Sequence, residues 1–212
     1  MNIKNKATIE LWDKWNSTGG PKYPHDKVIQ FLFRAYPDRL IRQNIHILDL
    51  GCGGGVHMEF LTAEGFLVHG QDISKNALDT TKNRLHSKGL NYESLKIGST
   101  HEIFLKNDSI DAVICIGVLE CINPSLLTSS LLEILRVLKI GGKALCLFAA
   151  QGDFRCQQPN PWQLHGYSEQ EVDKAVLSIQ PLCSYIYKDI YMTTYKSHLM
   201  TQKEHLLTLM KN

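Results

Sequence analysis

The 212-residue sequence has neither a long hydrophobic run nor a strong excess of one charge. Its longest apolar stretch, residues 112–119, is too short to cross a bilayer. The 23 Lys and Arg and the 21 Asp and Glu residues are scattered, so no basic face is predicted that would follow a nucleic-acid backbone. The first lysines precede no apolar run, which argues against a signal peptide. We therefore expect a cytoplasmic protein that binds neither membrane nor nucleic acid.

The sequence also lacks paired cysteines. Its six cysteines stand singly, with no C-x-x-C pair. This spacing argues against structural zinc and iron–sulfur ligation. We predict reduced, buried thiols and no metal site.

The stretch that organises the chain is residues 45–57, IHILDLGCGGGVH. An apolar run leads into four glycines that are interrupted only by Cys52. Such a run is typical of a buried parallel strand, and the glycines indicate a turn into a helix. Because glycine has no Cβ, the N–H groups of this turn can closely approach a polar ligand. Asp49, two residues before the first glycine, would favour a cation such as a ligand ammonium.

The loop does not complete a dinucleotide-binding fingerprint, because Val56 stands where G-x-G-x-x-G requires a third small residue. The string DLGCGGG instead resembles motif I of the class I S-adenosylmethionine-dependent methyltransferases of the small-molecule type. The resemblance covers residues 44–150 and implies S-adenosylmethionine as the cofactor. The loop residues that it places at the cofactor are Asp49, Gly51, Cys52, Gly53 and Gly55.

Asp72 is the second anchor of the predicted site. It follows the glycine loop by about 20 residues, at the end of the second strand, where an acid can accept both ribose hydroxyls of a cofactor. The alternative is a structural role, in which the carboxylate stabilises the N-terminus of the helix that Ser74 caps. The string GQDIS at residues 70–74 resembles the second motif of the family, and adds Ile73 to the expected cofactor contacts.

The resemblance adds four more expected cofactor residues. Ser99 and Thr100 stand where the family contacts adenine, although the family often has an acid in place of Ser99, and a plain turn is the alternative. Ile116 and Gly117, at the end of the fourth strand, would lie under the reactive methyl group.

Hydrophobic periodicity and caps predict alternating strands and helices. Helices are expected at residues 9–15, 26–36 with Asp26 as N-cap, 56–64, 75–88, 123–140 and 168–179. Strands are expected at residues 45–50, 66–72, 92–98, 111–117 and 143–150, with Gly141-Gly142 ending the helix before the last of these. By the resemblance, residues 183–194 and 204–211 form a closing antiparallel pair, although the second segment could equally be a helix.

This order predicts an α/β fold, a Rossmann-like doubly wound sheet that is mostly parallel, with a C-terminal antiparallel strand and helices on both faces. We expect one class I methyltransferase domain over residues 1–212. Its parts would be an N-terminal helical cap (1–43), a cofactor-binding core (44–150), and a lid with the C-terminal strands (151–212). Residues 151–166 have no periodicity and are interpreted as the lid.

We therefore expect methyl transfer from S-adenosylmethionine to an O or N atom of a small-molecule acceptor, by a monomer or homodimer. If a general base is used, the candidates are His25, Tyr23 and His165, each of which could instead be structural. Arg155, beside the possible pocket residues Phe154 and Trp162, would suit a carboxylate or phosphate, unless these side chains only pack the lid. The alternatives are an RNA- or protein-directed methyltransferase, a non-catalytic adenosyl-ligand-binding protein, and an NAD-dependent dehydrogenase.

Overall fold

The computed structural model describes residues 3–17, 20–195 and 200–212. Residues 1, 2, 18, 19 and 196–199 lie outside the described residues. The chain divides into two compact units, Met1–Ser99 with Ser109–Ile114, and Thr100–Asp108 with Cys115–Asn212. The prediction of one domain with a cap, a core and a lid stays a prediction.

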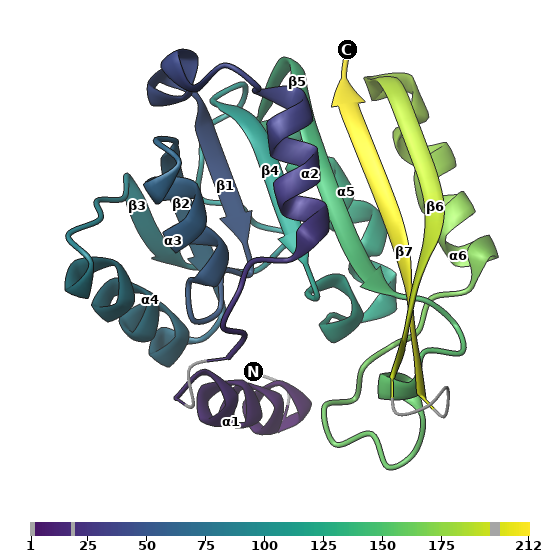
Figure 1. The fold of residues 1–212 in the computed structure, drawn as a ribbon. Helices are drawn as coiled ribbons and strands as arrows, with labels where there is room; N and C mark the ends of the chain where they lie inside the picture. Colours follow the sequence, from purple (N-terminus) through teal and green to yellow (C-terminus); the bar gives the residue numbers. More distant parts are fainter. Residues whose placement is uncertain (1–2, 18–19, 196–199) are drawn as a thin grey trace. The chain divides into compact units, whose positions relative to one another are not determined.

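The first unit contains a parallel sheet with intervening helices (Figure 1). Its elements are α1 (Ile3–Ser17), α2 (Asp26–Ala35), η1 (Arg39–Asn44), β1 (His46–Leu50), α3 (Val56–Ala63), β2 (Leu67–Asp72), α4 (Lys75–Ser87), β3 (Ser94–Ile97) and most of β4 (Ile110–Ile116). Both β2 and β4 pair with β1, and β3 pairs with β2. Four of the five residues of β1 are buried, as expected for an inner strand of a parallel sheet, and Asp49 is one of them.

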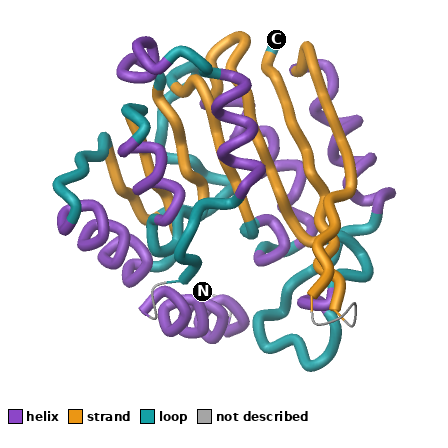
Figure 2. The backbone as a smooth tube through the Cα atoms, viewed as in Figure 1, coloured by secondary structure: helices purple, strands orange, loops and turns teal. Residues whose placement is uncertain are grey.

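The second unit is built on long antiparallel strands, which Figure 2 shows lying side by side. Its elements are η2 (Leu119–Cys121), η3 (Pro124–Leu126), α5 (Leu127–Val137), β5 (Leu138–Ala149), η4 (Phe154–Cys156), α6 (Glu169–Ile179), η5 (Gln180–Leu182), β6 (Cys183–Tyr195) and β7 (Met200–Lys211). Since β7 pairs with both β5 and β6, the last segment is a strand and the helical alternative is wrong.

The strand order is β3-β2-β1-β4-β5-β7-β6. The chain therefore builds the sheet outward from β1 in one direction and then from β4 in the other, which is the doubly wound arrangement. This confirms the predicted Rossmann-like α/β fold, with its mostly parallel sheet and antiparallel C-terminal strand. In such sheets ligands bind beyond the carboxyl ends of the strands, where the order reverses.

Two of the predicted helix caps are confirmed. The Ser74 hydroxyl accepts the N–H of Ala77 and begins α4. Ser168 and Glu171 form a reciprocal capping box at the start of α6. Such caps satisfy N–H groups that the first helical turn leaves unpaired, so local sequence alone sets these two helix starts.

Two local expectations are wrong. The cap of α2 is His25, whose ring Nδ1 accepts the N–H of Lys27, and Asp26 is the first helical residue. Gly141-Gly142 lie inside β5 and do not end the preceding helix, which stops at Val137. Lys211 Nζ donates to the carbonyl of Leu138 at 2.8 Å. Lys211 follows Leu138 by 73 residues, so no local sequence pattern predicts this hydrogen bond.

Three of the six cysteines are buried and three are partly exposed, so the prediction of buried thiols is only partly confirmed. Within the described ranges, no group of three or more His, Cys, Asp or Glu side chains is arranged to hold a metal ion. None of the described helices combines the length and the apolar character that a membrane span requires.

Candidate functional site

The glycine loop leaves β1 and enters α3 through three glycines with left-handed backbone. Their φ angles are +77° at Gly51, +51° at Gly53 and +78° at Gly55. A Cβ on Gly55 would lie 2.7 Å from Thr81 Oγ1, so both conformation and space require glycine at this position. Gly55 is also the N-cap of α3, with no side chain that could bond the first helical N–H groups. The predicted turn from strand to helix is confirmed.

Asp72 joins this loop to the end of β2. Its Oδ2 accepts the N–H of Gly53 at 2.9 Å, and its Oδ1 accepts the N–H of Ser74 at 2.9 Å. Burial raises the pKa of Asp72, and the two backbone hydrogen bonds oppose that rise. Asp72 therefore has a structural role, because it holds the glycine loop and the start of α4. Each carboxylate oxygen still has a second lone pair, so a ribose hydroxyl can be bound in addition.

Asp49 is a buried acid with an unsatisfied oxygen. Its side chain is 1% exposed, and among the described residues its Oδ2 has no hydrogen-bond partner. Burial, with repulsion from Asp72, raises the pKa of Asp49 to about 8, although a backbone hydrogen bond from Met58 lowers it. The carboxyl is thus held protonated near neutral pH until a positive charge is brought to it.

His57 lies next to Asp49, with its Nδ1 3.9 Å from Asp49 Oδ1. Its Nε2 accepts the backbone N–H of His25 at 3.2 Å, which assigns the ring hydrogen to Nδ1. Burial and repulsion from His25 lower the pKa of His57 to about 4. Because the histidine is neutral and Asp49 largely protonated at pH 7, their contact is no ion pair. His57 therefore supplies no positive charge to Asp49.

The other predicted cofactor residues of the first unit lie near these anchors. The thiol of Cys52 is buried, and burial raises its pKa well above the usual range. Ile73, directly after Asp72, is 44% exposed and accessible to a ligand. The carbonyl of Ser99 accepts a hydrogen bond of 2.7 Å from Gln71 Nε2, which fixes the chain after β3. The structure brings together Asp49, the glycine loop and Asp72, and their cofactor roles stay predictions.

Thr100, Ile116 and Gly117 belong to the second unit. The hydroxyl of Thr100 pairs with Ser130 Oγ at 2.7 Å and is buried. Gly117 has φ +71° directly after β4, and its N–H donates to the carbonyl of Leu147 at 2.8 Å. Their expected contacts with the cofactor also stay predictions.

The three candidate bases differ in their surroundings. Tyr23 is 82% exposed. The backbone N–H of His25 contacts His57, and its Nδ1 lies 3.0 Å from Asp26 Oδ1 as well as capping α2. His165 in the second unit shares a hydrogen bond of 2.9 Å with Glu171 of the α6 capping box. A role as general base stays a prediction for each of them.

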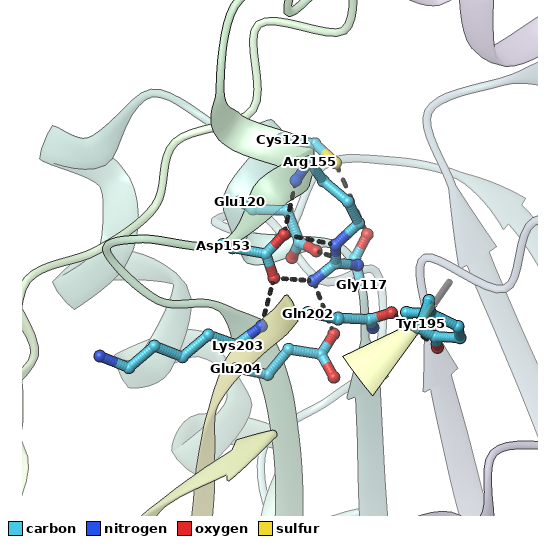
Figure 3. Close-up of polar contacts among 9 residues, drawn as sticks. All are labelled: Gly117, Glu120, Cys121, Asp153, Arg155, Tyr195, Gln202, Lys203 and Glu204. Carbon is cyan, nitrogen blue, oxygen red and sulfur yellow. Dashed lines mark hydrogen bonds and ion pairs between the residues drawn. The ribbon is translucent and has the colours of Figure 1, made fainter. Parts of the chain in front are cut away.

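Arg155 is surrounded by acids of its own unit (Figure 3). Its Nη2 lies 2.9 Å from Asp153 Oδ2 and 2.8 Å from Glu204 Oε1, and its Nη1 lies 3.6 Å from Glu120 Oε1. A guanidinium that already contacts three carboxylates is a poor receptor for another anion. This geometry disfavours the expected binding of a ligand carboxylate or phosphate by Arg155.

Sequence reasoning missed this group, which we call the Arg155 cluster and define as Glu120, Asp153, Arg155 and Glu204. Only Asp153 and Arg155 are close in sequence, and Asp153 is the N-cap of η4. Glu204 comes from β7, and its pairing with β5 brings it opposite Ala149. The strand register therefore creates the cluster, and only a correct pairing of the C-terminal strands could have revealed it.

The comparison with known families agrees with this geometry. Residues 47–142, which include the glycine loop and Asp72, match a family described as a methyltransferase domain. This segment of the chain is therefore similar to methyltransferase domains. The string that resembles motif I forms the loop between β1 and α3, and the string that resembles the second motif ends β2.

The proteins to which the chain is similar in sequence include enzymes of ubiquinone biosynthesis. The chain is 32% identical over 111 residues to the ubiquinone biosynthesis O-methyltransferase of Coxiella burnetii, covering 51% of this chain and 45% of that protein. For the enzyme of the same name from Rickettsia bellii the identity is 30% over 132 residues, covering 57% and 53%. The chain spans about half the length of the curated relatives it matches.

Among solved structures, magnesium protoporphyrin IX methyltransferase from Synechocystis, with S-adenosylmethionine bound, has a TM-score of 0.65. The two chains are 17% identical, and the match covers 100% of both. At this identity the similarity shows the fold alone.

Proposed function

We propose that the protein transfers the methyl group of S-adenosylmethionine to an O or N atom of a small-molecule acceptor. The single observation that carries the proposal is the arrangement at the ends of β1 and β2. There, a left-handed glycine loop, the buried Asp49 and the loop-bound Asp72 lie in one unit. The O-methyltransferase relatives support a small acceptor, and the near balance of charges offers no basic surface for RNA.

The residues of this site fit the cofactor. Asp49 presents a buried oxygen without a hydrogen-bond partner, which suits the ammonium of the methionine part. Asp72 is fixed by two backbone hydrogen bonds and retains acceptor capacity for the ribose hydroxyls. Ile73, partly exposed beside Asp72, would cover the adenine.

When bound, S-adenosylmethionine supplies an activated sulfonium methyl group. The chain itself then has to position that cofactor and an acceptor lone pair in line, and proximity of this kind contributes about 7–11 kcal/mol. Asp49 and Asp72 would fix the two ends of the cofactor. His57, held neutral by burial, would keep Asp49 in place without neutralising it. No general base is required for an acceptor that is already unprotonated at the reacting atom.

The proposal is tested by calorimetric titration with S-adenosylmethionine, S-adenosylhomocysteine and NAD. We expect both adenosyl ligands to bind and NAD not to bind. Asp72→Ala should weaken the adenosyl ligands at least about tenfold, because it removes the ribose acceptor. Asp79→Ala is the matched control, since Asp79 lies on α4 with an exposed side chain and forms an ion pair with Lys75 of the same helix.

Each outcome has a definite meaning. Binding of NAD alone, or of no adenosyl ligand, would overturn the methyltransferase proposal. Equal affinity in Asp72→Ala, with Asp79→Ala also unchanged, would leave the cofactor in place but refute the ribose role. If the adenosyl ligands bind, transfer of a labelled methyl group to a panel of phenols and amines tests the acceptor class. Location in the cytoplasm and a monomeric or dimeric state stay predictions.

A further inference from the structure

The Arg155 cluster contains more buried negative charge than positive charge. Three carboxylates face one guanidinium, and the side chains of Glu120, Asp153 and Glu204 are 2%, 0% and 3% exposed. Nearby basic groups do not restore the balance. Burial lowers the pKa of His205, so this neighbour of Glu204 is neutral, and Figure 3 shows the side chain of Lys203 extending away from the guanidinium. The cluster therefore has an excess of acid.

Two oxygens of the cluster lack hydrogen-bond donors. Asp153 is saturated, since its oxygens accept from the backbone and side chain of Arg155 and from the backbone N–H of Lys203. In contrast, Glu120 Oε2 and Glu204 Oε2 are buried and have no partner among the described residues. A buried acceptor without a donor costs about 1–3 kcal/mol, and more when it is charged. The cluster thus has too little positive charge and too few N–H donors for its three carboxylates.

An ammonium group supplies what is missing. It carries one positive charge and three N–H donors, whereas a hydroxyl brings one donor and no charge. A divalent metal would be repelled more strongly by the guanidinium at the centre of the cluster. The aromatic rings of Phe154, next to Arg155, and Tyr195 contact each other with centroids 6.2 Å apart. Such rings suit the organic part of a cationic ligand.

The position of Glu120 relates the cluster to the end of β4. A Cβ on Gly117 would lie 3.8 Å from Glu120 Oε1, so the acid lies close to the glycine that follows β4. Ligands of doubly wound sheets bind at such strand ends. We propose that the Arg155 cluster binds the ammonium group of a cationic small molecule, which in the proposed function is the methyl acceptor. The proposed binding site depends on the geometry of the cluster alone, and only the identification of its ligand as the methyl acceptor depends on the proposed function.

The test compares tyramine with tyrosol, which share a phenol and a two-carbon arm but end in an ammonium and a hydroxyl. Amide chemical shifts of the full chain, saturated with S-adenosylhomocysteine, give both dissociation constants at pH 8. We expect tyramine to bind at least tenfold more tightly, with shifts at Glu120, Arg155 and Glu204. Glu204→Gln should remove most of this preference, because it deletes a charge and retains the shape, and Glu120→Gln is the second variant. Glu93→Gln, at an exposed acid of the first unit, should change nothing.

Equal affinities for the two ligands, or no binding of tyramine, would overturn the site. So would a preference that survives both glutamine substitutions. Binding of S-adenosylhomocysteine distinguishes failure of the cluster site from failure of the proposed methyltransferase function. Its binding without an ammonium preference would refute only the cluster site, whereas a preference for tyramine in a protein that fails to bind S-adenosylhomocysteine would refute only the methyltransferase function.

Discussion

Asp49→Asn should stabilise the ligand-free protein and weaken its cofactor binding. The substitution removes the ionisable group and keeps the side-chain shape. In the folded chain the pKa of Asp49 is raised to about 8, because burial and Asp72 disfavour its charge, whereas the ordinary pKa of an aspartate is 3.8. The folded chain therefore holds a proton that the unfolded chain releases between these pH values. Stability consequently falls as pH rises from about 4 through about 8.

The size of this effect follows from proton linkage. Each pH unit in that window is worth 1.36 kcal/mol, so by pH 7 ionisation in the unfolded state disfavours folding by at most about 4 kcal/mol. Asparagine does not titrate and loses this penalty, while its buried amide still lacks one partner. We expect a gain in the free energy of unfolding of about 2 kcal/mol at pH 7 that vanishes near pH 4.

Urea denaturation of both proteins at several pH values measures the stability part. The binding part uses S-adenosylhomocysteine, which carries an ammonium, and 5′-methylthioadenosine, which has the nucleoside but no amino acid. Asp49→Asn should weaken the first ligand at least about tenfold and leave the second unchanged. In the unsubstituted protein, binding of S-adenosylhomocysteine should release a proton near pH 7, so its affinity should rise with pH up to about 8.

Two results would refute this reasoning. If the stability difference between the proteins does not change between pH 4 and pH 8, Asp49 is ionised in the ligand-free fold. If the substitution weakens both ligands equally, Asp49 supports the loop and does not meet the ammonium. A gain in stability with an unchanged affinity for S-adenosylhomocysteine would confirm burial while contradicting the assigned contact.

Four further substitutions test the packing, the ion pairs and a helix cap by urea denaturation. Gly70→Ala should lower the free energy of unfolding by about 1–3 kcal/mol, because its Cβ would lie 2.5 Å from Met58 Sδ. Gly65→Ala is the comparison: at φ +90° and in open space, it should lower the free energy of unfolding by only about 1 kcal/mol. Arg155→Ala should cost about 3–5 kcal/mol, because it leaves buried carboxylates unpaired, and an unchanged midpoint would contradict that pairing. Ser168→Ala should cost about 1 kcal/mol through loss of the capping box, whereas no loss would mean that the cap is redundant.

The fold was predictable from sequence where local signals coincide. The apolar run before Gly51, the cap at Ser74 and the capping box at Ser168 each determine an element from adjacent residues. The helix end at Val137 was not predictable from the two glycines, because β5 begins at Leu138 and both glycines lie inside it. Two adjacent glycines indicate a turn, but they can also lie in a strand whose partner is far along the chain.

The candidate cofactor site was predictable for a similar reason. Asp49, the glycine loop and Asp72 belong to two successive strands, so chain order alone places them at one edge of a parallel sheet. The surroundings of Arg155 were not predictable. An arginine on a loop suggests an anion receptor, and only the pairing of β5 with β7 reveals that Glu204 already occupies its guanidinium.

Among the described residues, both units bury carboxyl oxygens that have no hydrogen-bond partner: Asp49 Oδ2 in the first unit, and Glu120 Oε2 and Glu204 Oε2 in the second. Such groups destabilise the ligand-free fold, so a cation that binds them acts on stability as well as on occupancy. A ligand at 100 times its dissociation constant raises the free energy of unfolding by about 2.7 kcal/mol. If the two sites are separate, S-adenosylhomocysteine and tyramine should each raise the melting temperature, and together they should raise it further. A second ligand that adds nothing would mean that both cations compete for one site.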